Sequence, residues 1–209
     1  MMIERIGLKA GPSFLEKIFF KMSNPWQPTI AFAPAAVLLF YFAWQTGNHS
    51  WWGLIGFFLL GALTWTFVEY LLHRFVYHWK IRKEPFKSMV SGLHLAHHRD
   101  ADDIYLVFSP LIVSALYSVV LFFIFLAITQ SWTIAALMMS GLSVAYIYYE
   151  WLHFGAHHFK TSHPMYKYLR KHHLAHHFKN PKKCFGVTNP FWDMVFRTHM
   201  KLGKNNTKN

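Results

Sequence analysis

The chain alternates between long apolar stretches and shorter segments rich in charge and histidine. Residues 22–68 and 104–149 contain no Asp, Glu, Lys or Arg over 47 and 46 positions. A bilayer core about 30 Å thick requires about 20 apolar residues in a helix, so each stretch is long enough for two crossings. Polar residues at 45–50 and 129–131 divide the two stretches. The pattern therefore predicts four membrane-spanning helices, at 30–44, 51–72, 104–128 and 132–152.

Composition favours a membrane protein over a soluble one. Hydrophobic residues make up 54% of the chain and charged residues 14%, whereas a soluble domain carries about 25% charge. This hydrophobicity also excludes a disordered chain, and the single cysteine, Cys184, excludes an internal disulfide framework. The expected fold class is all-α, an integral membrane protein with about four transmembrane helices.

The distribution of positive charge predicts how these helices are oriented. Four crossings place both termini on one side, and all 21 Lys and Arg residues then fall on that side, in residues 1–21, 73–103 and 153–209. The positive-inside rule makes this side cytoplasmic. Helices buried inside a soluble protein, the alternative interpretation, would give no reason for this segregation. We therefore expect a multi-pass protein with cytoplasmic termini, in the plasma or inner membrane of a bacterium or the endoplasmic reticulum of a eukaryote.

Three segments follow from this pattern. Residues 1–28 are expected to form an amphipathic N-terminal lead-in, residues 29–200 the membrane domain, and residues 201–209 a basic solvated tail. The net charge of +12 accompanies two apolar stretches, so it favours anionic lipid headgroups over nucleic acid as the binding partner.

Histidine is concentrated where the predicted helices leave the membrane. Fourteen of the 15 His residues lie on the predicted cytoplasmic side. Ten of them form four groups: His73 and His78; His94, His97 and His98; His153 and His157; His173, His176 and His177.

Helical periodicity predicts how these groups are arranged. Positions i, i+3 and i+4 share one helix face, so the two H-x-x-H-H triplets, at 94–98 and 173–177, should each converge on one point. His153 and His157 are one turn apart on one face. His73 and His78 do not align on a straight helix, so either that helix ends or bends, or the two rings serve different metal ions.

Neutral imidazole is the commonest metal ligand in proteins, and ten imidazoles exceed the capacity of one ion. They suit two metal ions with about five ligands each, which leaves one open position if each ion is six-coordinate. Structural zinc prefers four ligands in a closed site. An open, nitrogen-rich pair therefore favours a redox metal such as iron, although imidazole also suits zinc, copper and nickel. A metal-storing or pH-responsive histidine patch would explain neither the repeated spacing nor the positions at helix ends.

At these residues the chain resembles the fatty acid hydroxylase superfamily of membrane enzymes, most closely the fatty acid 2-hydroxylases. The resemblance covers roughly residues 66–198 and rests on four stretches: EYLLHRFVYH at 69–78, HLAHH at 94–98, YEWLHFGAH at 149–157 and HHLAHHF at 172–178. It continues through GVTNPFWD at 186–193. The 15 residues between His78 and His94 favour the acyl-chain branch over carotenoid hydroxylases.

The resemblance implies a dinuclear metal centre under a cytoplasmic helical cap, with O2 as oxidant and an acyl chain as substrate. Iron is expected for the chemistry, and zinc is a possible occupant. The ligands implied are His73, His78, His94, His97, His98, His153, His157, His173, His176 and His177. His158 and His172 are additional to this set, as outer groups or local substitutes.

Two features depart from the family pattern. Its Tyr-Asp pair before the third histidine group is Tyr149-Glu150 here. The 21 residues before the first apolar stretch cannot hold the haem-binding cytochrome b5 domain of eukaryotic relatives. We therefore expect a separate electron donor, of cytochrome b5 or ferredoxin type.

The predicted activity is that of an O2-dependent lipid monooxygenase, an oxidoreductase that 2-hydroxylates a fatty acyl chain, free or in a sphingolipid. Alternatives are a sterol desaturase or carotenoid hydroxylase type of oxidation, and a metal transporter or sensor without redox turnover. Tyr149 and Glu150 are the candidate catalytic residues: Tyr149 would position substrate or relay a proton, unless it is an aromatic-belt residue. Glu69 and Glu150 would fix imidazole tautomers, unless they are interfacial carboxylates.

Overall fold

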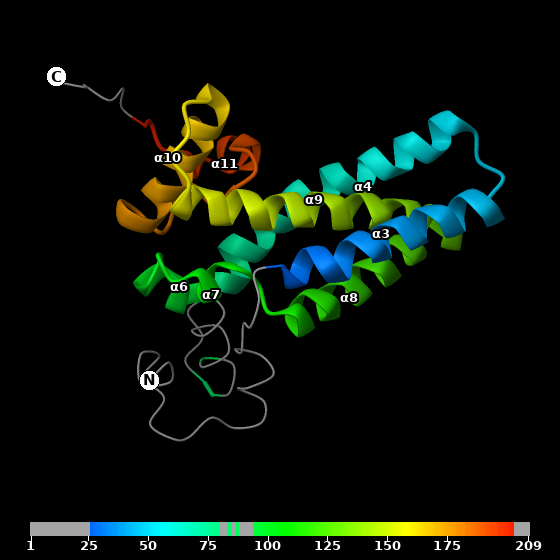
Figure 1. Cartoon of the computed structure of the whole chain (residues 1–209), viewed down its shortest axis with the longest axis horizontal. Coiled ribbons are helices and arrows are strands. Elements are labelled where there is room, and N and C mark those ends of the chain that lie inside the picture. The colour runs from blue at the N-terminus through cyan, green and yellow to red at the C-terminus, as the bar shows by residue number, and fades with distance from the viewer. Residues whose placement is uncertain (1–25, 80–82, 85–86, 88–93, 203–209) are drawn as a thin grey trace.

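Four long apolar helices run side by side, and shorter helices gather at one end of them (Figure 1). The structure, a computed structural model, describes residues 26–79, 83–84, 87 and 94–202. The long helices are α3 (Gln27–Thr46), α4 (Trp51–Leu71), α8 (Leu111–Thr129) and α9 (Trp132–His158). The shorter ones are η1 (Leu72–Tyr77), α6 (Ala96–Arg99), α7 (Ile104–Val107), α10 (Pro164–Phe178) and α11 (Phe191–Val195). Every regular element in the described part is helical, which confirms the all-α prediction.

Each long helix is long and apolar enough to cross a bilayer. Large hydrophobic side chains on α3, α4 and α8 are exposed, such as Val37 at 67%, Leu59 at 52% and Val119 at 55%. Such a surface suits lipid rather than water, because soluble proteins rarely expose extended apolar patches. Four candidate spans are therefore present, as predicted.

The third predicted span, over 104–128, is wrong in its boundaries. Its first four residues form α7, the chain is interrupted at 108–110, and α8 begins at Leu111. Pro110 causes the interruption, because a proline disfavours helical conformation in the residue before it and cannot donate a backbone hydrogen bond. The fourth helix is longer than predicted, since α9 continues through His153 to His158 without a break.

Helix α9 is the centre of the bundle and contacts α3, α4 and α8. It packs closely against α4, where two glycines face the opposite backbone. A Cβ atom added at Gly61 would overlap the carbonyl of Met138, and one added at Gly141 would overlap the carbonyl of Phe58. Small residues of this kind let helix backbones pack closely in a membrane, where lipid provides little hydrophobic force between helices.

The ends of the bundle away from the short helices are joined by short connections. Ser50 and Ser131 act as N-caps of α4 and α9, accepting hydrogen bonds from the backbone N–H groups of Gly53 and Ile134. His49 hydrogen-bonds through Nε2 to the Thr133 hydroxyl at 2.8 Å. The lead-in expected at 1–28 lies outside the described residues except for its last three, and the tail expected at 201–209 lies outside them except for its first two.

We expect Gly61→Ala to lower the thermal unfolding temperature of the purified protein, because the added methyl group must push α4 away from α9. Overpacking of this kind costs about 1–3 kcal/mol. The matched control is Gly56→Ala on the same helix, where an added Cβ meets no atom within 4 Å. That control should leave the unfolding temperature unchanged or raise it, since alanine favours helix by up to about 1 kcal/mol over glycine. Equal unfolding temperatures for the two variants would contradict this account.

Candidate metal centre

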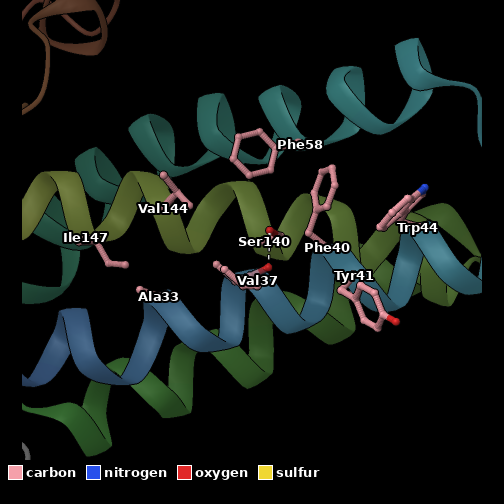
Figure 2. Close-up of a pocket in the computed structure, with 10 residues that line it drawn as sticks. Ala33, Val37, Phe40, Tyr41, Trp44, Phe58, Ser140, Val144 and Ile147 are labelled. Atoms are coloured by element: carbon pink, nitrogen blue, oxygen red, sulfur yellow. Dashed lines mark hydrogen bonds between the residues drawn. The ribbon is translucent and has the colours of Figure 1, made fainter.

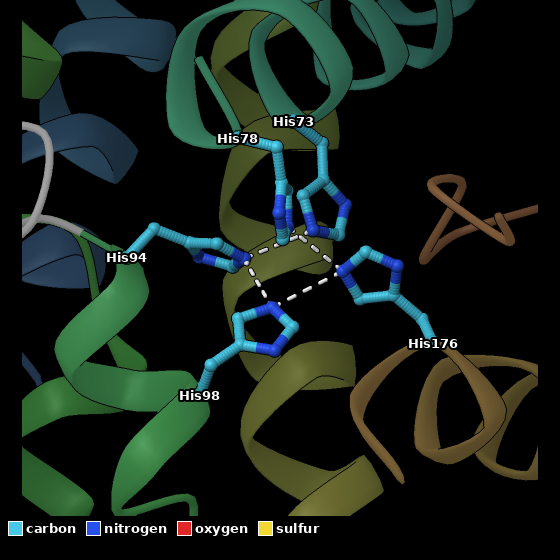
Figure 3. Close-up of side chains that lie close together, drawn as sticks. All are labelled: His73, His78, His94, His98 and His176. Atoms are coloured by element: carbon cyan, nitrogen blue, oxygen red, sulfur yellow. Dashed lines mark hydrogen bonds between the residues drawn. The ribbon is translucent and has the colours of Figure 1, made fainter. Parts of the chain in front are cut away.

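Ten histidines from distant parts of the chain meet at the end of the bundle that carries the short helices. They form two groups of five, and within each group one nitrogen per ring lies within 4.8 Å of the other four. The first group, shown in Figure 3, comprises His73, His78, His94, His98 and His176. The second group comprises His97, His153, His157, His173 and His177. The two groups touch, because the His98 and His177 rings stack with their centroids 4.0 Å apart.

A π-helical turn resolves the five-residue spacing of His73 and His78. Helix α4 passes directly into η1, which covers Leu72–Tyr77. A π-helix is wider than an α-helix and hydrogen-bonds from i to i+5, so residues five apart return to the same face. Both rings therefore enter the first group, and the alternative that they serve different ions is not what the structure shows.

The prediction that each H-x-x-H-H triplet converges on one point is wrong. In both triplets the pair at i and i+4 enters one group and the remaining ring enters the other. His94 and His98 belong to the first group while His97 belongs to the second; His173 and His177 belong to the second while His176 belongs to the first. The reason is that the two groups lie side by side, so each triplet sits between them and faces both.

The distances between ring nitrogens fit a six-coordinate metal better than a four-coordinate one. Neighbouring Nε2 atoms are 2.9–3.1 Å apart in the first group and 2.8–3.1 Å apart in the second. With metal–nitrogen bonds of about 2.1 Å, adjacent ligands of an octahedral ion are about 3.0 Å apart and those of a tetrahedral ion about 3.4 Å. Five ligands at the vertices of an octahedron would leave one coordination position open.

Hydrogen bonding between the rings cannot by itself satisfy these nitrogens. Each imidazole nitrogen has either one N–H or one lone pair. His94 Nε2 lies 3.0 Å from the Nε2 atoms of both His73 and His98, so at least one of these contacts is not a hydrogen bond. A cation at the centre of each group would accept a lone pair from every ring. The five nitrogens of each group therefore fit a bound metal ion.

Backbone carbonyls hold two of these rings in the tautomer that a metal needs. The Nδ1 atom of His176 lies 2.7 Å from the carbonyl oxygen of Lys183, and that of His73 contacts the carbonyl oxygen of Phe185. A carbonyl only accepts, so Nδ1 carries the proton and Nε2 keeps its lone pair toward the group. The loop that begins at Lys183 thus orients part of the first group.

Burial keeps the rings outside the membrane-spanning helices neutral. It lowers the pKa of His78 to about 4 and, with help from neighbouring rings, the pKa of His98 to about 3. Burial and the surrounding imidazoles also hold the pKa of His94 and of His97 well below the ordinary value. Neutral rings are the form that binds metal ions.

The two predicted tautomer-fixing carboxylates contact backbone and hydroxyl groups instead. Glu69 accepts hydrogen bonds from Val187 N and Thr188 N and from the Thr188 hydroxyl, at 2.6 Å in the last case. Glu150 accepts from Ser109 N, with its two oxygens at 3.2 and 3.4 Å. Glu150 therefore satisfies an N–H group that the break before α8 leaves unpaired. The prediction that these carboxylates hold imidazoles directly is wrong, because tertiary structure provides both with nearer donors.

Tyr149 lies beside the second group, as its position one turn before His153 suggests. Its side chain is buried, its ring is stacked 5.8 Å from that of His153, and Trp65 packs edge-on against it at 5.5 Å. The first group has a comparable neighbour that the sequence did not single out. Tyr77 stacks on His94 at 5.2 Å and shares a 2.8 Å hydrogen bond with the Tyr117 hydroxyl. The only sequence signal for Tyr77 is its place directly before His78.

The two additional histidines stand outside both groups. The His172 Nδ1 atom lies 3.0 Å from the carbonyl oxygen of Gly186. The His158 ring packs on Phe154 with centroids 4.5 Å apart. Neither replaces a member of the two five-histidine sets.

Comparison with known proteins identifies the family. A match to the fatty acid hydroxylase family covers residues 58–198. The chain belongs to the fatty acid hydroxylase family. It is thus an enzyme of a metal-dependent, lipid-oxidising family, and its ten clustered histidines all lie within the matched region.

Relatives of this hydroxylase are known from plants, animals and fungi. It is 32% identical over 202 residues to dihydroceramide fatty acyl 2-hydroxylase FAH1 of Arabidopsis thaliana, covering 92% of this chain and 82% of the relative. It is 34% identical over 148 residues to the fatty acid 2-hydroxylase of Mus musculus, covering 69% and 39%. A solved structure of full-length scs7p, in which only the hydroxylase domain is visible, superposes with a TM-score of 0.79 at 30% identity, over 90% of this chain and 70% of that one.

We expect acidification to destabilise the metal-free hydroxylase. Below the ordinary histidine pKa of about 6.5 the unfolded chain binds protons that the folded rings, with their lowered pKa values, do not. Stability is therefore full above pH 6.5 and declines as the pH falls from there toward the pKa values of His78 and His98, about 4 and 3. Thermal unfolding between pH 7 and pH 5, with a chelator present, measures the effect.

His98→Gln provides the control for this pH dependence, because it removes one of the titrating rings. Its unfolding temperature should fall less steeply on acidification than that of the unchanged protein. An unfolding temperature that stays constant or rises from pH 7 to pH 5 would contradict the burial of neutral imidazoles.

Proposed function

We propose that this protein is a dimetal, O2-dependent hydroxylase that introduces a 2-hydroxyl group into a fatty acyl chain, free or in a sphingolipid. The observation that carries the proposal is the pair of touching five-imidazole groups, each with a six-coordinate nitrogen spacing. The position of the hydroxyl is supported by the names of the relatives, which are fatty acyl and fatty acid 2-hydroxylases.

Each five-histidine group would hold one metal ion through one nitrogen of each ring. When bound, a redox-active pair such as iron would supply the activation of O2 that insertion into an unactivated C–H bond requires and that no side chain provides. Zinc would occupy the same nitrogens without redox chemistry. The chain itself contributes neutral rings and the burial of each group.

The acyl chain would lie along the apolar bundle with its reacting end at the histidines. Figure 2 shows one groove suited to a hydrocarbon tail, a cavity of about 570 Å³ between α3, α4 and α9. Its walls include Val37, Phe40, Val144 and Ile147. The hydroxyl of Ser140, which also lines the groove, donates a 2.7 Å hydrogen bond to the Ala36 carbonyl. A second groove of about 320 Å³ lies between α3, α8 and α9. Both grooves are lined by side chains of the membrane-spanning helices, so a hydrocarbon tail would enter them sideways from the bilayer.

The histidine end of the bundle would face the cytoplasm, as the positive-inside distribution predicts, and would receive electrons from a separate acidic carrier. Exposed Lys160 and Lys179 suit such docking. Arg74 is engaged within the fold instead, where it donates to the Tyr70 hydroxyl at 2.7 Å and lies over the Phe75 ring.

The purified protein should contain close to two metal ions per chain, one for each group. His97→Ala should lower this count, because it removes a second-group ligand that approaches both His153 and His157. His49→Ala, at the other end of the bundle, is the control and should retain the full count. Elemental analysis of the three proteins decides the matter, and an undiminished count in His97→Ala would remove His97 from the site.

Cells that express the protein with a working electron donor should accumulate acyl chains that carry one additional oxygen atom at carbon 2. His97→Ala should abolish this product. Mass spectrometry of the lipids, with fragmentation to locate the hydroxyl, tests substrate and position together. A hydroxyl at another carbon, or its absence with an active donor, would contradict the 2-hydroxylase proposal.

A further inference from the structure

The loop from Lys183 to Val187 presents carbonyl oxygens to two imidazoles of the first group. The carbonyl of Phe185 contacts His73 Nδ1, and the carbonyl of Lys183 lies 2.7 Å from His176 Nδ1. Both rings belong to the first group. The loop is therefore the outer support of two first-group rings.

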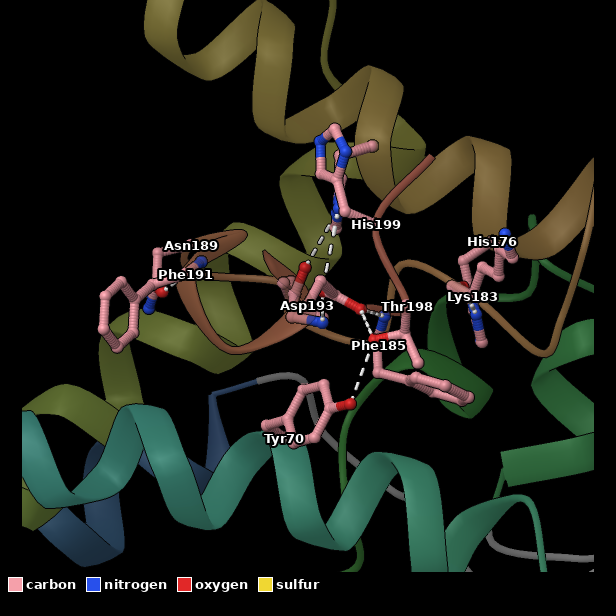
Figure 4. A network of polar contacts seen from close by, with 12 residues as sticks. Tyr70, His176, Lys183, Phe185, Asn189, Phe191, Asp193, Thr198 and His199 are labelled. Carbon is pink, nitrogen blue, oxygen red and sulfur yellow. Dashed lines mark hydrogen bonds and ion pairs between the residues drawn. The ribbon is translucent and has the colours of Figure 1, made fainter. Parts of the chain in front are cut away.

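The N–H side of the same loop is bound by buried carboxylates. The N–H of Gly186 donates to Asp193 Oδ2 at 2.8 Å, and the N–H of Phe185 donates to Asp193 Oδ1 at 2.9 Å. Asp193 is completely buried, and its Oδ1 also accepts from the Thr198 hydroxyl at 2.7 Å. Figure 4 shows this carboxylate between Phe185 and Thr198, with Tyr70 of α4 touching Thr198.

One peptide unit joins the two sets of contacts. The carbonyl of Phe185 and the N–H of Gly186 belong to a single amide, which is planar and conjugated. This amide accepts a hydrogen bond from His73 at one end and donates one to the Asp193 carboxylate at the other. Linked hydrogen bonds polarise one another, so a carboxylate on the N–H makes the carbonyl a stronger acceptor.

We propose that Asp193 is a positioning residue of the first histidine group, acting on His73 through the Phe185–Gly186 amide. The inference rests on the proposed metal binding. Metal-bound histidines commonly donate their outer N–H to a carboxylate or a carbonyl, which fixes the tautomer and raises the basicity of the ring. Here the carboxylate acts through one interposed amide. It keeps the proton on His73 Nδ1 and the lone pair of Nε2 directed into the group.

Gly186 makes this close arrangement possible. A Cβ atom there would overlap the carbonyl oxygen of Asn189 and lie 3.1 Å from Asp193 Oδ2. A side chain at this position would therefore push the amide away from the carboxylate.

Glu69 of α4 provides a comparison, because its carboxylate binds the same loop. Its carboxylate accepts from the N–H of Val187, and the carbonyl of that amide, on Gly186, lies 3.0 Å from His172 Nδ1. His172 belongs to neither five-histidine group, and its Nε2 atom also lies 3.6 Å from Asp193 Oδ2. Replacing Glu69 thus removes a buried carboxylate from the loop without acting through an amide on a candidate ligand.

The experiment measures the zinc affinity of each histidine group separately, by competition with a chelator, in variants of the whole chain that keep only one group intact. His157→Ala with His173→Ala leaves the first group, and His78→Ala with His98→Ala leaves the second. Asp193→Asn should weaken zinc binding about 10- to 100-fold where the first group remains. It should leave the affinity unchanged where the second group remains, because the hydrogen bonds of Asp193 reach no amide that contacts a ring of that group. Glu69→Gln should change the zinc affinity of either group by less than Asp193→Asn changes the zinc affinity of the first group.

The same substitution can be tested in the chain with both groups intact. At a chelator concentration at which the unchanged protein keeps two zinc ions, Asp193→Asn should keep only one. Should Asp193→Asn fail to accumulate, Thr198→Val removes a hydrogen bond to the same carboxylate and is expected to weaken the first group in the same direction.

Equal weakening of both groups would overturn the inference, because it would reduce Asp193 to a general contributor to the fold. Unchanged affinity of both groups would overturn it too. If neither single-group protein binds zinc with Asp193 intact, the proposed metal site itself fails and the inference falls with it. That outcome is distinct from the first two, in which zinc binding is present before Asp193 is changed.

Discussion

The structure depends on a crowding of neutral imidazoles that only a cation can satisfy fully. Ten rings each turn one nitrogen toward one of two centres, and the neighbouring Nε2 atoms among them are 2.8–3.1 Å apart. Burial keeps the rings outside the membrane-spanning helices uncharged, and a nitrogen with a single lone pair or proton cannot pair with two neighbours. Other parts of the fold hold these rings in place: a π-helical turn, a long central helix and a loop whose carbonyls contact the outer nitrogens of two rings.

The bundle delivers the rings from a membrane scaffold to one end of the molecule. Helix α9 crosses the bundle and continues without interruption to His153 and His157, so the packing of a membrane helix fixes part of the second group directly. The first group depends on α4, which turns into η1 to bring His73 and His78 to one face. Close packing of α4 against α9 at Gly61 and Gly141 therefore fixes the two groups relative to each other.

Much of this was predictable from the sequence, because charge-free stretches and histidine spacing are local signals. Four spans and the ten clustered histidines follow from such signals. The sequence does not predict that His97 and His176 each join a different group from the other two histidines of their triplet. That assignment depends on where α6 and α10 lie relative to both centres. The partners of Glu69 and Glu150 are set by segments more than 40 residues away in the chain. The break before α8 did have a local signal, Pro110, in an otherwise apolar stretch.

The most direct test of the account is an anomalous difference map from crystals of the purified protein, recorded at the absorption edge of the bound metal. The account predicts two peaks, one inside each five-histidine group, each surrounded by one nitrogen from each of its five rings. A single peak shared by all ten histidines, peaks away from them, or no peak at all in metal-loaded protein would contradict it.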